Sequence, residues 1–234
     1  MLCAGGYGWV VTACAAVIAS LFIGVTFNWG IIQHSLVATG LAPASTLAWV
    51  GSTSTGCISA FAALNSRVLQ KVGARGGALM GVCSIGTGEL LASFSTRNVP
   101  ALFVTAGFVT GLGYSMSLVS ITIVPAQYFR RRRGLSNGLV YAGGGIGGGI
   151  FSFILSAIAT NYGPAWTFRA LALITFSVGV PCALLLKERI SLRAARWEWR
   201  LFRDPKFVIL FFAGVRFSPL LLLLLCKHFL ALTR

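Results

Sequence analysis

Long apolar stretches, broken by short basic clusters, constrain this chain more than any other feature. The clearest junction lies at residues 128–149, where Arg130, Arg131, Arg132 and Arg133 border a stretch without a charge that continues to residue 168. A soluble core has no use for such a junction. At a membrane surface, arginines stay in water beside anionic headgroups while the apolar stretch crosses the hydrocarbon. The sequence therefore predicts an integral membrane protein.

The composition limits the surface that the chain can present. Only 10% of the 234 residues are charged and 56% are hydrophobic, whereas an ordinary globular domain is about 25% charged. So few charges cannot cover a water-facing surface, which makes the lipid bilayer the main partner. The net charge of +15 would suggest nucleic acid if it lay on one polar domain. The basic residues instead lie in clusters between apolar runs, so we expect no nucleic-acid partner.

A membrane helix needs about 20 apolar residues, and six stretches reach that length. They are residues 8–32, 46–64, 77–96, 99–124, 135–160 and 165–186, with a candidate seventh at 207–226. The alternating pattern of transmembrane strands is absent, and many small residues favour close helix packing. We predict an all-α integral membrane protein with a six-span bundle at 1–186, a basic loop at 187–206 and a partial or aberrant seventh span and tail at 207–234.

The basic residues also predict an orientation. Most of the 19 lie in alternate loops, at 67–75, 130–133 and 187–206. By the positive-inside rule these loops and the amino terminus are cytoplasmic, and a plasma-membrane location is expected. The loop at 187–206 mixes tryptophans with arginines, which suits either an interfacial amphipathic helix or a solvated linker.

Catalytic and metal-binding patterns are missing from the sequence. The six cysteines are spread singly and both histidines stand apart, so we interpret the cysteines as small apolar residues within helices. Residues 143–148 formally match a dinucleotide fingerprint, but a basic loop precedes them and no acidic residue follows at the required distance. We expect no cofactor, no metal and no enzymatic activity, because no acid–base pair or nucleophile constellation is present.

Two motifs carry a family resemblance. Residues 5–9 read Gly-Gly-Tyr-Gly-Trp before a long apolar run. A second motif, at the start of the fifth predicted span, comprises Tyr128, Phe129, Arg131 to Arg133, Leu135, Ser136, Gly138, Ala142, Gly143 and Gly147. Together they resemble monocarboxylate-transporter-like members of the major facilitator superfamily, over residues 5–190 and with the character of the fungal branch. Two departures stand out: Ala4 replaces the family's acidic residue, and residues 27–30 lack the lysine of proton-coupled lactate carriers.

The resemblance implies one half of a twelve-span carrier. Such carriers bind solute between two six-span halves and move it by alternating access. The expected partner is a small organic solute, monocarboxylate-like or other, with a coupling proton as a further candidate. Early termination after a leucine run at 220–225 favours a truncated or mis-spliced chain, lacking its carboxy-terminal half. Alternatives are a half that completes itself with a second copy, and a membrane scaffold or receptor-like protein that moves no solute.

The resemblance also nominates site residues, because spans one, four and five border the cavity in this superfamily. The substrate-binding candidates are Asn28, Trp29, Tyr114, Ser117, Asn137 and Tyr141. For Asn137 and Tyr141 the alternative is helix packing and capping. Gly144 and Gly148 have the small-xxx-small spacing of a packing surface.

Charged residues provide the remaining candidates. Glu89 is the one carboxylate inside the first six predicted spans, where a charge costs a few kcal/mol. It is therefore either a proton-coupling group or, as we expect, a neutral side chain bonded to a neighbouring helix. Arg130 to Arg133 are candidates for a cytoplasmic gate. Arg97 and Arg169 fit interfacial snorkelling.

Overall fold

The computed structural model describes residues 6–129 and 133–187. The predicted seventh span, the loop beyond Lys187 and three of the gate candidates, Arg130, Arg131 and Arg132, lie outside these residues. The chain divides into two units at residue 193, and the first unit contains everything described below.

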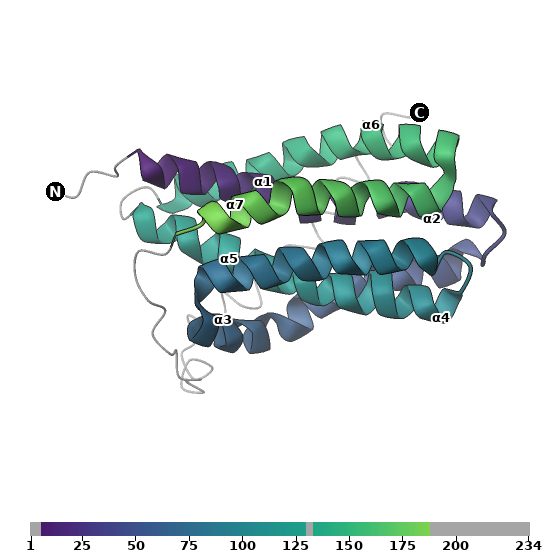
Figure 1. Cartoon of the computed structure of the whole chain (residues 1–234), viewed down its shortest axis with the longest axis horizontal. Coiled ribbons are helices and arrows are strands. Elements are labelled where there is room, and N and C mark those ends of the chain that lie inside the picture. Colours follow the sequence, from purple (N-terminus) through teal and green to yellow (C-terminus); the bar gives the residue numbers. More distant parts are fainter. Residues whose placement is uncertain (1–5, 130–132, 188–234) are drawn as a thin grey trace, which may run out of the picture. The chain divides into compact units, whose positions relative to one another are not determined.

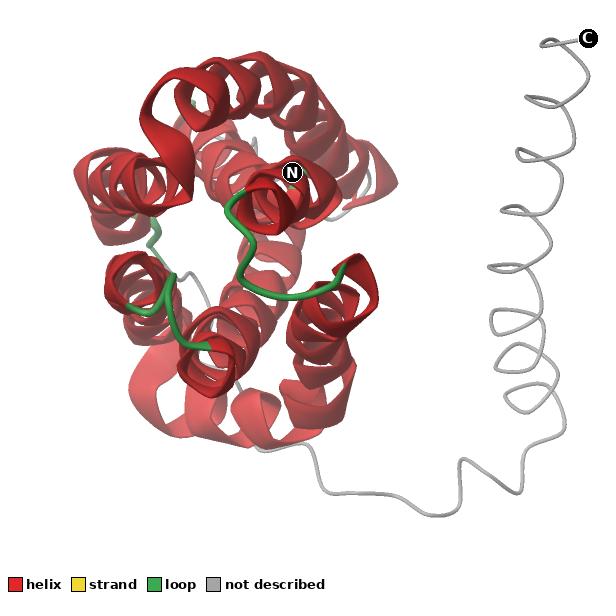
Figure 2. Cartoon of the chain, turned by 90° about the vertical axis from the view of Figure 1, so that its right-hand side faces the viewer, coloured by secondary structure: helices red, strands yellow, loops and turns green. Residues whose placement is uncertain are grey.

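The described residues form helices joined by short connections, with no strand among them (Figures 1 and 2). In chain order they are α1 (Tyr7–Phe27), α2 (Trp29–Ala38), α3 (Ala44–Phe94), α4 (Val99–Leu102), the π-helix η1 (Phe103–Val109), α5 (Thr110–Tyr128), α6 (Arg133–Ile174), the π-helix η2 (Thr175–Gly179) and α7 (Val180–Leu185). The prediction of an all-α fold is confirmed for this part of the chain.

The long helices α3 and α6 each double back once, at a glycine (Figure 1). Gly73 has φ 84° and Gly163 has φ 80°, a left-handed backbone that glycine adopts without a side-chain clash. Pro164 follows Gly163 and cannot donate a helical hydrogen bond, which reinforces the second reversal. The described chain thus runs back and forth as six helical segments, with α1–α2 the first and α6 after Gly163, η2 and α7 the last.

Apolar length also marks membrane-crossing helices. Four described stretches are long and apolar enough to span a bilayer: Tyr7–Phe27, Leu64–Phe94, Val99–Tyr128 and Gly134–Leu185. The second stretch contains the reversal at Gly73, close to its start, and the last contains the reversal at Gly163 and so supplies two antiparallel segments. The predicted first span, 8–32, is broken at Asn28, because its side-chain amide donates to the Gly24 carbonyl at 2.8 Å and ends α1 there.

A close helix contact joins α1 to the first part of α6. A Cβ atom added to Gly147 would lie 2.1 Å from Cβ of Ser20, and one added to Gly143 would lie 2.7 Å from Cβ of Ala16. Both distances are far below van der Waals contact, so only glycine permits this approach. The glycine-rich run is therefore a helix surface packed on α1, not a phosphate loop. We call this contact the α1–α6 seam.

The two predicted packing glycines lie beside this seam. A Cβ on Gly144 would meet Cδ1 of Ile23 at 2.6 Å, whereas the nearest neighbour of a Cβ on Gly148 is Cα of Gly24 at 3.9 Å. The structure therefore places Gly144 in tight contact and leaves room at Gly148. The glycines that contact Ala16 and Ser20 of α1, Gly143 and Gly147, are also four residues apart, but they lie one residue earlier than the predicted pair.

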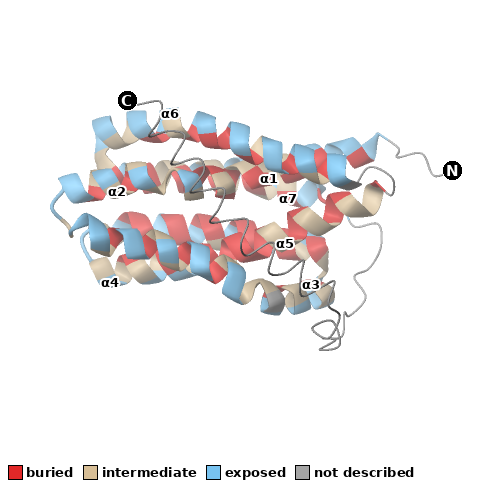
Figure 3. Ribbon diagram, turned by 180° about the vertical axis from the view of Figure 1, so that it is seen from behind, coloured by how far each residue is buried: buried red, intermediate tan, exposed pale blue. Residues whose placement is uncertain are grey.

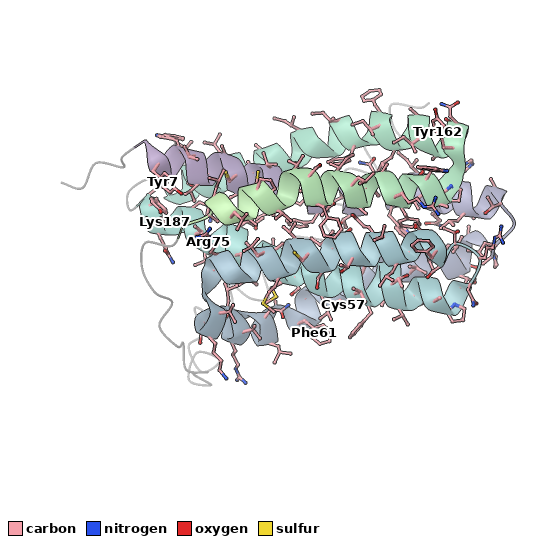
Figure 4. The ribbon with its side chains drawn as sticks, viewed as in Figure 1. Tyr7, Cys57, Phe61, Arg75, Tyr162 and Lys187 are labelled. Carbon is pink, nitrogen blue, oxygen red and sulfur yellow. The ribbon has the colours of Figure 1, made fainter. Side chains whose placement is uncertain are left out.

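The two sequence motifs meet at one end of the bundle. The rings of Trp9 and Phe129 lie 5.1 Å apart edge to face, and those of Tyr7 and Tyr128 lie 6.3 Å apart. Tyr7 also donates to the Leu185 carbonyl at 2.9 Å, so residues from α1, α5 and α7 are joined here. Figure 4 shows Tyr7, Arg75 and Lys187 at this end and Tyr162 at the other.

Buried side chains line the facing sides of these helices (Figure 3). One cluster contains Val11, Ile18, Ile85, Tyr114 and Ile121, and a second contains Ile32, Leu47, Leu102, Leu155 and Leu171. The structure also brings two cysteines together: Cys14 and Cys182 are free thiols within hydrogen-bonding contact. Nothing in their sequence positions, far apart and each within an apolar run, indicates this contact.

The seam predicts a contrast between two glycines one half-turn apart on α6. Gly147→Ala should lower the free energy of unfolding by about 1–3 kcal/mol, because α1 must move away. Gly149→Ala meets nothing within 4 Å and should be neutral or stabilising by up to about 1 kcal/mol, since alanine favours helix. Denaturant titration in detergent, followed by circular dichroism, measures both. Equal effects of the two substitutions would contradict the seam.

Candidate functional site

A small cavity lies among α1, α2, α3, η1, α5 and α6. Its volume is about 20 Å³, enough for one water-sized group. The lining residues are Val25, Thr26, Trp29, Gly51, Ser54, Glu89, Ala106, Thr110, Tyr114, Phe168 and Leu171. We call it the Glu89 cavity after its one carboxylate.

A wider pocket adjoins this cavity and shares Thr26, Trp29 and Gly51 with it. Its volume is about 490 Å³, and its walls come from α1, α2 and the first part of α3. Its other lining residues are Gln33, Ala48, Ser52, Thr55, Gly56 and Ser59. This adjoining pocket is rich in hydroxyl and amide groups, which suits a water-filled approach to the cavity.

Trp29 forms the boundary between the two spaces. Its indole Nε1 donates to the Leu47 carbonyl on α3 at 3.3 Å. The ring rests on Gly51, where an added Cβ would lie 2.5 Å from Cδ1 of the indole. Glycine at this position thus lets the indole lie flat against α3. Of the predicted substrate-binding residues, Trp29 and Tyr114 line the Glu89 cavity.

Glu89 is held deep in the bundle and is 2% exposed. Oε2 accepts a hydrogen bond from the Thr175 hydroxyl of η2 at 2.9 Å, whereas Oε1 has no partner. The bond to Thr175 is the neighbouring-helix contact that we expected of a neutral side chain. The unpartnered oxygen and the position on the cavity wall are features of the alternative, a group that exchanges a proton or binds a ligand.

The segments around Glu89 are irregular. Thr175, its partner, begins the π-helix η2, and Thr110 of the cavity directly follows the π-helix η1. A Cβ on Gly88, next to Glu89, would lie 2.6 Å from the Thr110 side chain, so η1 and α5 approach α3 closely here. π-Helical turns occur frequently at functional sites. This irregularity could not be foreseen from the apolar pattern.

Tyr114 reaches the cavity from α5 and is 4% exposed. Its ring packs against Phe22 of α1, with centroids 6.0 Å apart. Tyr114 therefore joins the seam helix α1 to the cavity wall. Ser117, one turn further along, is fully buried in the contact with α3, where its Oγ would lie 2.5 Å from a Cβ on Gly81.

The remaining predicted binding residues lie outside the cavity lining. Asn28 donates both amide hydrogens, to the Gly24 carbonyl at 2.8 Å and to the Gly148 carbonyl of α6 at 2.7 Å. Asn137 is half-buried near the start of α6, and its Oδ1 has no partner. Tyr141 is 47% exposed. The structure thus brings Trp29, Tyr114 and Glu89 together and places the other four candidates elsewhere.

Three hydroxyl residues of the cavity escaped the sequence analysis: Thr26, Ser54 and Thr110. Thr26 lies three residues before Trp29, so its proximity could have been found from helical spacing. Ser54 and Thr110 carry no such signal among the many serines and threonines of these helices. Within the described residues no group of three or more His, Cys, Asp or Glu side chains forms a metal site.

Arg169 lies near the Glu89 cavity but does not line it. Its guanidinium is 5.1 Å from the Trp166 ring centroid and 5.5 Å from that of Phe94, and Nε donates to the Ser93 hydroxyl at 3.5 Å. Both aromatic side chains are more than half exposed. Cation–π contacts of this kind hold an arginine at an apolar surface. The predicted role of an interfacial anchor remains a prediction.

Comparison with known proteins identifies the family. The family model of the Major Facilitator Superfamily matches residues 2–232. The chain belongs to this superfamily. Its members are multi-pass membrane proteins, so the predictions of an integral membrane protein and of a membrane transporter family are confirmed.

Curated relatives of this major facilitator are monocarboxylate transporters. It is 28% identical to monocarboxylate transporter 13 of Bos taurus over 184 residues, which are 78% of this chain and 42% of that protein. It is 32% identical to monocarboxylate transporter 3 of Mus musculus over 165 residues, 70% of this chain and 32% of that protein. It is 30% identical to monocarboxylate transporter 2 of Rattus norvegicus over 198 residues, 82% of this chain and 39% of that protein. The chain thus spans less than half the length of these relatives.

The hydrogen bonds of Asn28 predict that loss of its side-chain amide destabilises the bundle. Asn28→Leu removes the bond to Gly148 that joins α1 to α6 and should lower the free energy of unfolding by about 0.5–2 kcal/mol. Asn161→Leu is the matched control, because Asn161 is exposed and donates only within its own helix, to Ala157 at 2.8 Å. The same denaturant titration compares them. A loss for Asn161→Leu as large as for Asn28→Leu would contradict an interhelical role.

Proposed function

We propose that this chain is the amino-terminal six-span half of a secondary-active carrier that moves a small organic solute by alternating access. The observation that carries the proposal is the pair of adjoining spaces around Trp29, one small and one wider, within a member of a transporter superfamily. The relatives are named as monocarboxylate transporters, so a monocarboxylate-like solute is the first class to consider. We also propose, from the two sequence motifs, that the chain belongs to the fungal branch of the monocarboxylate-transporter-like members.

In this proposal the described bundle moves as one body. The α1–α6 seam and the contact of α3 with α5 are too tight to slide, because backbone atoms lie where side chains would otherwise be. Alternating access then comes from rocking this bundle against a second one around a shared site. Solute would contact Trp29, which lines both spaces, and Tyr114 of the Glu89 cavity. Ser117, Asn137 and Tyr141 would support helix packing or face the second bundle.

Glu89 supplies the coupling group in this account. A buried carboxyl with one unpartnered oxygen can hold a proton in one state and release it in another if water reaches it. The adjoining pocket offers that route. Glu89 is then both hydrogen-bonded to a neighbouring helix and able to exchange a proton. The two roles predicted for this residue are compatible in this proposal.

The orientation follows from the basic end of the bundle. Arg75 and Lys187 lie at the end that carries Tyr7 (Figure 4), and the motif arginines follow Phe129 directly in the sequence. We place this end in the cytoplasm of a plasma-membrane carrier. Arg130 to Arg133 then border the inner gate.

Reconstitution tests this proposal. Vesicles that contain these 234 residues alone should accumulate no solute, because in this proposal they form only one of the two walls of the solute site. The same chain continued by a carboxy-terminal six-span half should accumulate a solute from a panel of radiolabelled monocarboxylates, amines and neutral metabolites. Accumulation by the 234 residues alone would overturn the assignment as a half-carrier. If the nucleotide sequence beyond Arg234 encodes five further spans in any of the three frames, these and the candidate span at 207–226 are the six-span half to use.

A further inference from the structure

Several hydrogen-bond donors of the Glu89 cavity are already used within the protein. The Thr26 hydroxyl donates to the Phe22 carbonyl at 2.7 Å, and the Thr110 hydroxyl donates to the Ala106 carbonyl. The indole N–H of Trp29 donates to Leu47. Each hydroxyl has one hydrogen, which is thus already used within the protein, while its oxygen can still accept. The Thr26 and Thr110 oxygens are therefore left as acceptors, while the hydroxyls of Ser54 and Tyr114, which also line the cavity, can either donate or accept.

Glu89 adds the strongest acceptor. The side chain is 98% buried, since only 2% is exposed, and Oε1 has no hydrogen-bond partner. Oε2 is already occupied by Thr175. An unpartnered carboxylate oxygen in a buried wall is costly unless a donor or a positive charge reaches it. The cavity adjacent to it is where such a group would bind.

Aromatic rings and the absence of basic side chains complete the pattern. Trp29, Tyr114 and Phe168 line the cavity, and aromatic faces attract a cation. Neither lysine, arginine nor histidine is among the residues that line the cavity or the adjoining pocket. Arg169 directly follows Phe168 of the cavity lining, but its side chain contacts Ser93, Phe94 and Trp166 instead. A carboxylate anion finds no counter-charge on these walls.

We propose that the Glu89 cavity binds the ammonium group of a small organic amine, with the rest of the solute in the adjoining pocket. An ammonium brings three hydrogen-bond donors and a positive charge. Glu89 Oε1 and the oxygens of Thr26 and Thr110 are the matching acceptors. This inference rests on the proposed transport function and specifies its solute, which differs from the monocarboxylates named for the relatives.

A proton and an ammonium group then compete for the same carboxylate. Glu89 cannot pair with a cation when it is protonated, so amine binding should weaken as the pH falls. The groups that face Glu89 are Thr175 of η2, Tyr114 of α5 and the cavity hydroxyls, and the carboxyl of Glu89 is the acid among them. If a proton and an amine occupy this carboxylate in turn, the carrier exchanges one for the other across the membrane, which is antiport.

The test uses three probes of similar size on the full 234-residue chain in lipid nanodiscs. Phenethylamine carries the ammonium, 2-phenylethanol is neutral and 3-phenylpropionate is the anion. Equilibrium binding of each is measured by dialysis at several pH values. We expect phenethylamine to bind at least about tenfold more tightly than either other probe, and its affinity to fall toward acid pH.

Variants locate the effect. Glu89→Gln keeps the shape of the side chain and should reduce phenethylamine affinity at least about tenfold and abolish its pH dependence. Glu188→Gln removes a carboxylate beyond α7 and should leave the affinity unchanged. Size-exclusion chromatography and circular dichroism monitor folding, and the three-probe comparison needs no variant.

The failures are distinguishable. If the alcohol or the carboxylate binds as tightly as the amine, or if Glu89→Gln keeps the pH dependence, the ammonium site is overturned, whereas solute binding and the proposed carrier stand. If phenethylamine does not bind at all, the ammonium site is also overturned. Failure of the carrier itself is detected separately, in the vesicle experiment with the completed chain.

Discussion

The close approach of α1 and α6 is the contact on which the rest of the bundle depends. Gly147 and Gly143 leave no space for a side chain against Ser20 and Ala16. This contact brings the Gly148 carbonyl within 2.7 Å of the Asn28 amide, and Asn28 in turn ends α1. The helix therefore restarts at Trp29, with the indole resting on α3. The glycine run sets the position of the cavity wall without touching the cavity.

The chemistry of the Glu89 cavity depends on which of its hydrogen-bonding groups already have a partner in the protein. The threonine hydroxyls and the indole donate to main-chain carbonyls, and the bond from Thr175 occupies one oxygen of Glu89. What remains is a small, aromatic space lined by hydroxyl groups, with one unpartnered carboxylate oxygen. A proton or an ammonium group satisfies that oxygen, and their competition would couple the movement of one to the other. The family suggests transport, and the cavity suggests which solutes it favours.

The sequence predicted the structure correctly where a pattern of residues is compatible with a single kind of structure. Apolar length predicted helices, and the absence of a strand and an acid around the glycine run correctly excluded a nucleotide loop. The spacing of that run predicted packing but not its register, because Gly143 and Gly147 differ from Gly144 and Gly148 only in the direction they face. The meeting of Cys14 with Cys182, the burial of Ser117 against α3 and the use of the Thr110 hydroxyl by its own helix depend on the tertiary fold. Single-sequence patterns cannot supply them.

The central claim is that the carboxyl of Glu89 is the exchangeable acceptor of the cavity. Infrared difference spectroscopy of the full chain in lipid tests it most directly, because protonated and ionised carboxyl groups absorb at different frequencies. The account predicts a protonated-carboxyl band that disappears when phenethylamine is added and is missing from Glu89→Gln. A band that is unaffected by the amine, or that persists unchanged in Glu89→Gln, would contradict it.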